Sequence, residues 1–399
     1  MDVLATLRQK PSLNLFPIEN RLSPRALEAL ATDANNRYPY SETPVAVYGD
    51  VTGLNDVYEY CVELTKRFYG ARHGFVNFLS GLHTMHTVIT AVARPGDRVM
   101  LLAPEDGGHY ATDTICAGYG YEREFLPFDR AAMEIDYAKL AVRVAERPVD
   151  LIYLDASSTL RFPDARALRA AAPDALICLD ASHLLGLLPV APQTLVLDGG
   201  FDSISGSTHK TLPGPQKGLL VTNSDTMADK VAARIPYTAS SSHSANVGAL
   251  AVTLEELLPH RAAYAQQVIA NARALGRELA GRGFDVAGAS FGHTDTHQVW
   301  VQFPEGNTPH EWGRTLTAAA IRTTTVVLPS NAQPGLRLGT QELTRWGMRE
   351  QDMSAVAELL ARLLLRGESV ESVTGDVAEL ALSFPGVAFA GALEPVTAP

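Results

Sequence analysis

The stretch Ser207-Thr208-His209-Lys210-Thr211-Leu212-Pro213-Gly214-Pro215 places a single lysine between a run of hydroxyl side chains and a Gly/Pro turn. A lysine amine held in this way can form a Schiff base with a carbonyl group. The alternative is a lysine at a strand-to-turn boundary that stays solvated, since most lysines carry out no chemistry. The choice between the two depends on what accompanies Lys210 elsewhere in the chain.

A second motif lies upstream of Lys210. The apolar run Ala175–Leu179 is typical of a buried parallel strand, and it ends at Asp180, which is followed by Ala181-Ser182-His183. The carboxyl ends of strands in an open α/β sheet face the ligand crevice, so we expect Asp180 to meet a ligand there. The alternative for Asp180 is the N-cap of the next helix, a common position for aspartate.

Two further motifs carry candidate binding residues. In Pro104-Glu105-Asp106-Gly107-Gly108-His109-Tyr110, two glycines let the backbone pass close to a ligand ahead of His109. In Gly335-Leu336-Arg337-Leu338-Gly339-Thr340, the guanidinium of Arg337 can bind both oxygens of a carboxylate. The alternatives are an ordinary loop histidine and an arginine in a surface ion pair.

Together these motifs resemble the serine hydroxymethyltransferase family of enzymes that depend on pyridoxal phosphate (PLP), with threonine aldolases and transaldolases among its relatives. The resemblance extends from about Arg37 to Gly347. It implies an α/β fold of PLP fold type I, which is aspartate aminotransferase-like, with a mostly parallel central sheet in a large domain and a smaller C-terminal α/β domain. It also implies these roles: Lys210 carries PLP, Asp180 contacts the pyridine nitrogen, His109 stacks on the ring, His183 packs on its edge or orients Asp180, and Arg337 holds the substrate carboxylate.

The pattern along the chain agrees with this fold, because short apolar runs alternate with helical patterns. Expected strands are Phe75–Leu79, Arg98–Ala103, Asp150–Leu154, Leu176–Asp180, Ser203–Gly206 and Gly218–Thr222, and expected helices are His83–Ala93, Tyr137–Glu146 and Ala165–Ala172. A helix over His260–Arg282 is expected to bridge two domains, ahead of strands His297–Phe303 and Thr323–Leu328 and the helix Ser354–Leu365. We expect an N-terminal arm over residues 1–36, a large PLP-binding domain over 37–255 and a small domain over 256–399.

The loop Ser80-Gly81-Leu82-His83 is predicted to hold the cofactor phosphate, because free backbone N–H groups and the positive end of a helix meet there. The family has a serine where Leu82 stands, and His83, Thr84 or His209 could compensate. A second phosphate contact is implied for a partner subunit's loop, which here is Tyr237-Thr238-Ala239-Ser240-Ser241-Ser242-His243. The hydroxyls of Ser240 and Ser241 would serve in it. The arginine that the family carries after Gly214-Pro215 is Gln216 here.

An N-terminal segment resembles the family's pair of active-site tyrosines, here Tyr38 and Tyr48, which in relatives reach the neighbouring subunit's site. The resemblance therefore implies a homodimer; the alternative is that both are core aromatics. The family carries a glutamate where this chain has Tyr40, and Glu42 could replace it only with a shifted register. The asparagine-bearing segment of the folate pocket is reduced to residues 325–331, and the connection to Arg337 is short. Use of tetrahydrofolate is therefore doubtful.

Composition limits the remaining possibilities. The chain has 399 residues, a net charge of −11 and no basic run, which disfavours a nucleic-acid partner. Cys61, Cys116 and Cys178 have no metal-ligand spacing, and we interpret them as core residues in a reducing cytoplasm. We expect no signal peptide and no membrane-spanning segment, and a loosely ordered tail from Gly386 to Pro399.

These features predict an enzyme that makes or breaks the Cα–Cβ bond of a β-hydroxy α-amino acid, with an amino acid and an aldehyde as substrates. Breaking this bond requires a base near the hydroxyl, and the candidates are His109, Tyr48 and Glu42. We expect a folate-independent aldolase or transaldolase. The alternatives are a tetrahydrofolate-dependent hydroxymethyltransferase, a PLP aminotransferase or decarboxylase, and a non-catalytic protein with this fold.

Overall fold

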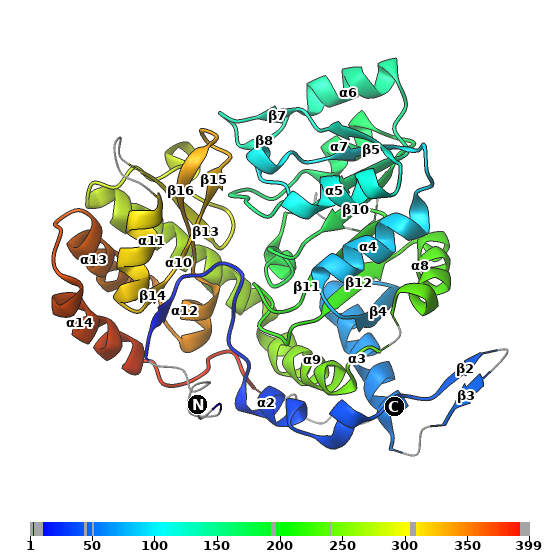
Figure 1. Ribbon diagram of the computed structural model, residues 1–399, viewed down its shortest axis with the longest axis horizontal. Helices are drawn as coiled ribbons and strands as arrows, with labels where there is room; N and C mark the ends of the chain where they lie inside the picture. Colours follow the sequence, from blue (N-terminus) through cyan, green and yellow to red (C-terminus); the bar gives the residue numbers. More distant parts are fainter. Residues whose placement is uncertain are drawn as a thin grey trace.

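The computed structural model describes residue 3 and residues 11–43, 46–49, 52–192, 197–198, 200–239, 241–303 and 309–391. Its largest sheet has the strand order β4-β12-β11-β10-β9-β5-β6, and β12 alone runs antiparallel to its neighbours (Figure 1). The strands are β4 (His73–Phe78), β5 (Arg98–Leu101), β6 (Glu122–Phe125), β9 (Leu151–Leu154), β10 (Leu176–Asp180), β11 (Ser203–Ser207) and β12 (Gly218–Thr222). The prediction of a mostly parallel central sheet is confirmed.

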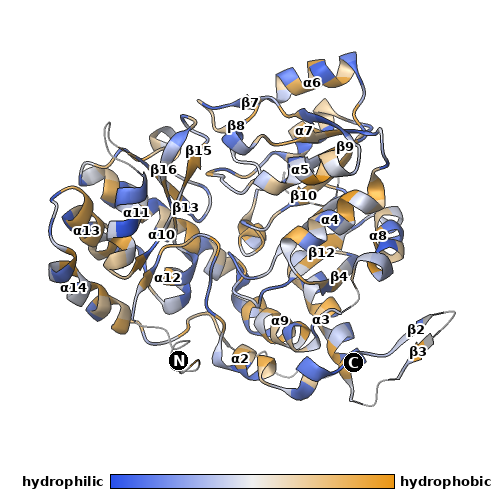
Figure 2. Ribbon diagram, viewed as in Figure 1, coloured by the Kyte–Doolittle hydropathy of each residue, from blue (hydrophilic) through white to orange (hydrophobic). Residues whose placement is uncertain are grey.

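Helices cover both faces of this sheet because side chains along a strand point alternately to opposite faces. On β9, Ile152 and Leu154 join one apolar core, and Leu151 and Tyr153 join the other. The first core receives side chains from α3 (Leu54–Tyr69), α6 (Tyr137–Glu146), α7 (Ala165–Ala171) and α9 (Ser244–Leu257). The second receives them from α4 (Gly81–Val92), α5 (Tyr110–Gly118) and α8 (Asp225–Thr238). Figure 2 shows that the helices around this sheet are of mixed polarity.

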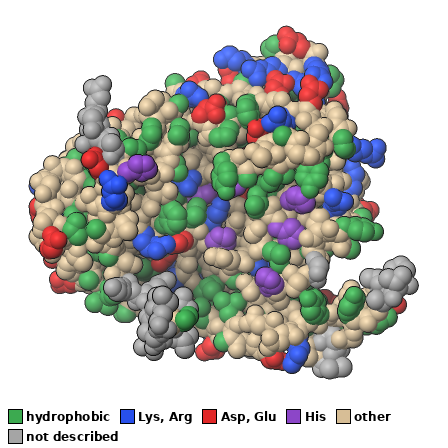
Figure 3. Space-filling view, in the orientation of Figure 1, with side chains coloured by type: hydrophobic (Ala, Val, Ile, Leu, Met, Phe, Trp, Pro, Cys, Tyr) green, Lys and Arg blue, Asp and Glu red, His purple; other side chains and the backbone are tan. Residues whose placement is uncertain are grey.

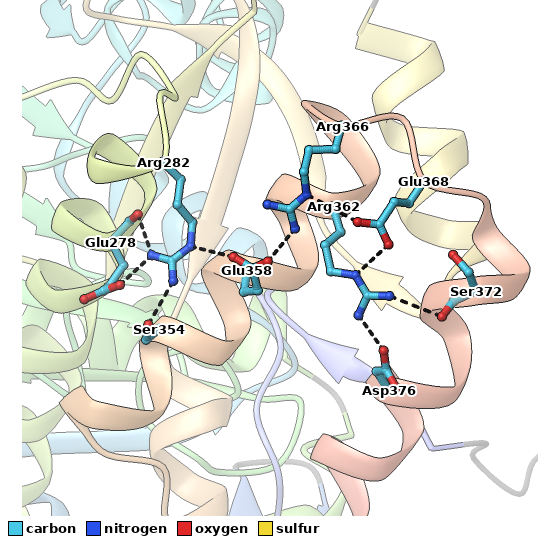
Figure 4. Close-up of polar contacts among 9 residues, drawn as sticks. All are labelled: Glu278, Arg282, Ser354, Glu358, Arg362, Arg366, Glu368, Ser372 and Asp376. Carbon is cyan, nitrogen blue, oxygen red and sulfur yellow. Dashed lines mark hydrogen bonds and ion pairs between the residues drawn. The ribbon is translucent and has the colours of Figure 1, made fainter.

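A smaller unit is built on an antiparallel sheet of order β13-β16-β15, formed by Gln298–Gln302, Gln333–Gly339 and Thr324–Leu328. Its helices are α11 (Pro309–Ala318), α12 (Gln341–Trp346), α13 (Met353–Leu364) and α14 (Val370–Leu382). Ion pairs join α13 to its neighbours on the surface, such as Arg282 with Glu358 and Arg362 with Asp376 (Figure 4). Exposed pairs of this kind contribute little stability individually, so the unit depends mainly on its apolar core.

The N-terminal residues connect the two units. Strand β1 (Leu13–Asn14) pairs in parallel with β14 (Ile321–Arg322) of the small unit, and α2 (Pro24–Leu30) then packs on α9 of the large one. The domain boundaries expected after residues 36 and 255 remain predictions.

The helix expected over His260–Arg282 is α10 (Arg261–Gly281), and it belongs to both cores. Tyr264 and Val268 pack in the core of the large unit, whereas Leu275 and Leu279 pack in that of the small one. The bridging role predicted for this helix is therefore observed, and it places the small sheet opposite the carboxyl ends of the central strands (Figure 1).

Some elements were not predicted from the sequence. Helix α9 is buried on most sides, so its residues lack the polar stripe that marks an amphipathic helix. Helix α8 contains Pro236, and it continues through Tyr237 and Thr238, two residues that we expected in the phosphate loop. Two hairpins were also unpredicted: β2 (Ser41–Thr43) with β3 (Ala46–Tyr48), and β7 (Phe128–Asp129) with β8 (Glu134–Ile135). The first projects away from the body of the chain (Figure 1).

Within the described ranges, no helix is long and apolar enough to cross a membrane. The three cysteines are buried and unpaired, as predicted for core residues. Ser240 and residues 392–399 of the expected tail lie outside the part of the chain that the structure describes.

Candidate active site

Lys210, Asp180 and His109 line one cleft with an empty volume of about 350 Å³ at the carboxyl ends of β9, β10 and β11. His183 and Ser182, which follow β10, lie in the same wall. Figure 3 shows histidine side chains (purple) along this hollowed centre of the molecule. The structure thus brings together residues that are far apart in the sequence, at the edge of the sheet where the sequence placed them.

Lys210 follows β11 and lies in a turn that is closed by hydrogen bonds between Thr208 and the Gly214-Pro215 segment. The Gly214 N–H donates to the Thr208 carbonyl at 2.8 Å, and the Thr208 hydroxyl donates to the Pro215 carbonyl at 2.5 Å. Burial lowers the pKa of Lys210 to about 8, while the Asp180 charge opposes this shift and the Arg337 charge adds to it. More of this amine is therefore uncharged at neutral pH than in a solvated lysine, as a nucleophile requires.

Asp180 ends β10, and its Oδ1 accepts a hydrogen bond from the Ser182 N–H at 2.8 Å. The alternative role as a helix N-cap is not observed, because residues 182–187 form turns that lead only to a short 3-10 helix over Leu188–Val190. The hydrogen bond to Asp180 thus comes from the Ser182 N–H, and the predicted roles of His183, packing on the ring edge or orienting Asp180, remain predictions. His183 faces Lys210, with 3.4 Å between His183 Nε2 and Lys210 Nζ.

A second carboxyl group, which was not predicted from the sequence, lies beside Asp180. Asp155 directly follows β9 and is buried; its Oδ2 accepts a hydrogen bond from the Thr112 hydroxyl, and its Oδ1 has no partner among the described residues. Burial raises the pKa of Asp155 well above its ordinary value, and the neighbouring Asp180 charge adds to the shift. The sequence did contain a signal for this residue: Asp155 is the first residue after β9, just as Asp180 is the last residue of β10.

His109 is the N-cap of α5, and its Nδ1 accepts a hydrogen bond from the Ala111 N–H at 3.3 Å. Burial lowers the pKa of this imidazole. The neutral ring therefore carries its proton on Nε2. The preceding Gly107 has a φ of +102°, and a side chain there would collide with the Ser158 carbonyl, so glycine is required for this close approach.

Arg337 lies on β16 of the small unit and reaches across to the loop after β9. Its Nη1 donates to the Ser157 carbonyl at 2.8 Å and to the Ser158 hydroxyl at 3.1 Å, while its buried Nε has no partner among the described residues. Burial lowers the pKa of Arg337 to about 10, so it remains a cation at neutral pH. The alternative of a surface ion pair is not observed at this 8% exposed side chain.

The loop expected to hold the phosphate opens α4, as predicted. The Ser80 hydroxyl caps the helix by accepting from the His83 N–H at 3.1 Å, and Leu82 lines the cleft. A side chain at Gly81 would collide with the Ser207 hydroxyl, so this loop packs tightly against β11. The other backbone N–H groups of the first turn remain the phosphate donors that we predict.

Of the three residues proposed to compensate for Leu82, two already have hydrogen-bond partners within the chain. His83 is occupied, because its Nδ1 accepts from the Leu79 N–H at 3.0 Å and its Nε2 donates to the Thr238 carbonyl at 2.8 Å. Thr84 donates its hydroxyl to the Ser80 carbonyl at 2.9 Å. His209 keeps a buried Nδ1 without a partner among the described residues, and burial lowers its pKa to about 4. His209 is the remaining candidate of the three.

The burial of Lys217 was also not predicted from the sequence. Gln216, at the position of the family's arginine, is exposed, but Lys217 is fully buried, and its Nζ donates to the Ser242 carbonyl at 2.6 Å. Burial lowers the pKa of Lys217 to about 8. This lysine holds the loop that contains Ser241, whereas Ser240 is outside the described residues.

The tyrosines of the N-terminal segment do not reach this chain's own cleft. Tyr38, Tyr40 and Tyr48 are 59%, 43% and 56% exposed, which excludes the alternative of core aromatics. The Tyr40 hydroxyl donates to Glu42 Oε2 at 2.7 Å. None of the four residues lines the cleft around Lys210.

The side chains that line the cleft fit pyridoxal phosphate. A buried lysine of lowered pKa faces a carboxylate at the end of the neighbouring strand, and Arg337 retains an N–H group without a partner among the described residues. Lys210 would hold the cofactor aldehyde, Asp180 its ring nitrogen and His109 its face. Fold and site together define a PLP-dependent enzyme of fold type I.

Comparisons with known proteins identify the family. The family model for serine hydroxymethyltransferase matches residues 4–360. The chain is 34% identical over 392 residues to the serine hydroxymethyltransferase of Methanocaldococcus jannaschii, covering 94% of this chain and 91% of that protein. It is 35% identical over 381 residues to the fluorothreonine transaldolase of Streptantibioticus cattleyicolor, covering 92% of this chain and 60% of that protein. The chain belongs to the serine hydroxymethyltransferase family.

A solved structure has the same overall fold. The L-threonine transaldolase of Pseudomonas fluorescens, in its internal aldimine state, superposes with a TM-score of 0.90 at 29% identity, covering 95% of this chain and 90% of that one. The predicted fold class and the prediction of a PLP-dependent transferase or lyase are confirmed. The roles given to individual residues remain predictions.

Proposed function

We propose that this chain is a folate-independent aldolase or transaldolase. It would cleave the Cα–Cβ bond of a β-hydroxy α-amino acid such as threonine, release an aldehyde and join the retained glycine unit to a second aldehyde. The observation that carries the proposal is Tyr40, which stands where the family resemblance places a glutamate and donates its hydroxyl to Glu42 Oε2 at 2.7 Å.

The small sheet supports the absence of a folate pocket. Strands β15 and β16 pair up to Leu328 with Gln333, so residues 329–332 alone connect them. This turn replaces the longer segment from which the family's pteridine-binding asparagine comes. Together with Tyr40 in place of the glutamate, this short turn supports a reaction that does not use tetrahydrofolate.

The described residues can divide the chemistry as follows. PLP, when bound, supplies the electron sink that stabilises negative charge at the substrate α-carbon. Arg337 would bind the substrate carboxylate through N–H groups that the Ser157 and Ser158 contacts leave free. Asp180 would keep the proton on the cofactor's ring nitrogen, and Lys210, with its lowered pKa, would receive protons at neutral pH.

The base for the substrate hydroxyl would come from a second copy of this chain. His109 is poorly suited because the Ala111 N–H occupies its Nδ1, which leaves its Nε2 as a donor. Tyr48 and Glu42 lie on a hairpin that projects from the body and exposes Val47 by 63% (Figure 1). A projecting hairpin that exposes a valine and a tyrosine suits insertion into a homodimer partner's site. We further propose a cytoplasmic enzyme, consistent with its buried free cysteines.

The test is a reaction of the purified holoenzyme with L-threonine and an aromatic aldehyde, with and without tetrahydrofolate. We expect acetaldehyde and a new β-hydroxy amino acid in both samples, and no new amino acid from a Lys210→Ala chain. Strict dependence of cleavage on tetrahydrofolate would instead establish a hydroxymethyltransferase. Amine transfer to a keto acid would establish an aminotransferase.

A further inference from the structure

We propose that Gln298 is a positioning residue that holds His183 in one tautomer, with the proton on Nε2, so that His183 presents an N–H donor to Lys210. Gln298 is the first residue of β13 in the small unit, and His183 follows β10 in the large one. Both side chains are almost completely buried, at 0% and 2% exposure, so protein groups rather than water decide the orientation of the Gln298 amide and the tautomer of His183.

The orientation of the Gln298 amide follows from groups that can only donate or only accept. Its Oε1 accepts from the Trp300 indole N–H at 3.0 Å and from the Thr159 backbone N–H at 3.3 Å. Its Nε2 donates to the Ser157 carbonyl at 3.0 Å. Reversing the amide would place its NH2 group against two N–H donors and its oxygen against the Ser157 carbonyl, so buried polar groups would lose their hydrogen bonds.

The second N–H of this amide then points at His183. Gln298 Nε2 lies 3.1 Å from His183 Nδ1, so His183 Nδ1 must be the acceptor. A proton on Nδ1 would face the amide N–H directly. The amide therefore selects the tautomer in which His183 Nε2 carries the hydrogen.

His297 independently favours the same tautomer. Its Nε2 lies 3.2 Å from the Pro17 carbonyl, which can only accept, so His297 Nε2 carries a hydrogen. The same Nε2 lies 3.3 Å from His183 Nδ1. His183 Nδ1 thus faces donor groups on two side chains, and both the other tautomer and the imidazolium are disfavoured.

The consequence falls on Lys210, whose Nζ lies 3.4 Å from His183 Nε2. An N–H donor favours a lysine nitrogen with a free lone pair and opposes a protonated one. The charged and titratable groups around His183 act in the same direction, because burial and then Lys210, Arg337, His297 and His109 lower its pKa. Asp180 is the opposing charge at Lys210. The inference rests on the PLP site and not on whether folate is used.

The direct test is nitrogen-15 NMR of the holoenzyme labelled at histidine, with the His183 signals assigned by their loss in His183→Asn. We expect a neutral His183 ring with its proton on Nε2 throughout the neutral pH range. A proton on Nδ1, or on both nitrogens, would overturn the proposal. This measurement needs no change at Gln298, and the cofactor-free protein gives the same readout independently of cofactor binding.

The variant test uses Gln298→Glu, whose carboxylate accepts a hydrogen bond where the amide donates one. We expect His183 to gain a proton on Nδ1, and the pH midpoint of the visible band of the Lys210-linked cofactor to rise by about one unit or more. Gln302→Glu makes the same change at the opposite end of β13 and is the matched control, with an unchanged midpoint.

A direct effect of the new charge is separated from an effect through His183 by the double variant. In a His183→Asn background, Gln298→Glu should lose most of its effect on the midpoint. A shift of the same size with and without His183 would overturn the proposal, as would an unchanged His183 signal in Gln298→Glu.

Discussion

Replacing Arg337 with lysine should weaken amino acid binding while leaving the fold and the cofactor in place. The size of the expected loss of affinity follows from the contacts of Arg337. Arg337 is 8% exposed, its Nη1 is already engaged by Ser157 and Ser158, and its Nε has no partner among the described residues. A lysine ammonium cannot span both oxygens of a carboxylate from this position, so one charge-assisted hydrogen bond is lost, worth about 1.5–3 kcal/mol. This corresponds to a loss of affinity of about 10- to 100-fold, since each 1.4 kcal/mol is tenfold.

The assay for Arg337→Lys is a titration of the cofactor's visible spectrum with glycine, together with kcat/KM for threonine. The matched control is Arg322→Lys, which makes the same change in an exposed ion pair with Glu19 at 2.6 Å and should bind glycine like the parent. The melting temperature, measured alongside, separates lost binding from lost folding. An unchanged glycine affinity in Arg337→Lys would place the carboxylate site elsewhere and refute the reasoning.

Three further predictions concern the other site residues. Asp180→Asn should keep the cofactor but lower turnover by roughly a hundredfold or more, because a neutral amide cannot keep the ring nitrogen protonated; near-normal turnover would remove this role. The pKa of Lys210 is lowered from 10.5 to about 8, so the unfolded chain binds more protons between these values and the cofactor-free protein should gain stability as pH rises through them. Urea unfolding at pH 7 and at pH 10.5 measures this gain in the free energy of unfolding, and Lys210→Met should reduce it by at most about 3 kcal/mol. Lys217→Met should have a similar effect, because the pKa of Lys217 is also lowered to about 8. A free energy of unfolding that rises with pH as steeply in Lys210→Met as in the parent would contradict the lowered pKa. Mixing Lys210→Ala chains with Tyr48→Phe chains should restore roughly a quarter of parental activity if sites are shared between subunits, whereas no recovery, or a fully active monomer in sedimentation, would exclude sharing.

The parts of the site that could be predicted from the sequence are those whose signal is local. Lys210 precedes a Gly/Pro turn, and Asp180 ends an apolar strand, so their position at the sheet's carboxyl edge follows from the residues around them. Arg337 and His109 are marked by neighbouring glycines in the same way. The alternation of apolar strands with helical patterns likewise predicted the mostly parallel sheet.

Other residues could not be assigned because their environment is created only by folding. A lysine is usually exposed, and only folding buries Lys217 near Cys61 of α3 and brings the Ser242 carbonyl to its Nζ. Helix α9 itself was missed because burial on most sides removes the polar stripe on which helix prediction depends. His83 is the opposite case. Its place in a local motif made it a candidate to bind the phosphate, but in the folded chain its Nε2 donates to the Thr238 carbonyl.

Gln298 shows why protonation is the property least accessible from sequence. Its amide meets Trp300 two residues away, but also Thr159 and His183, which lie 139 and 115 residues away along the chain. No single one of these contacts determines where a proton lies, because the tautomer of His183 follows from the whole chain of donors and acceptors that begins at the Trp300 indole. That chain crosses from the small unit to the large one. The relative placement of the two units therefore sets the hydrogen-bonding character of the side chain that faces Lys210.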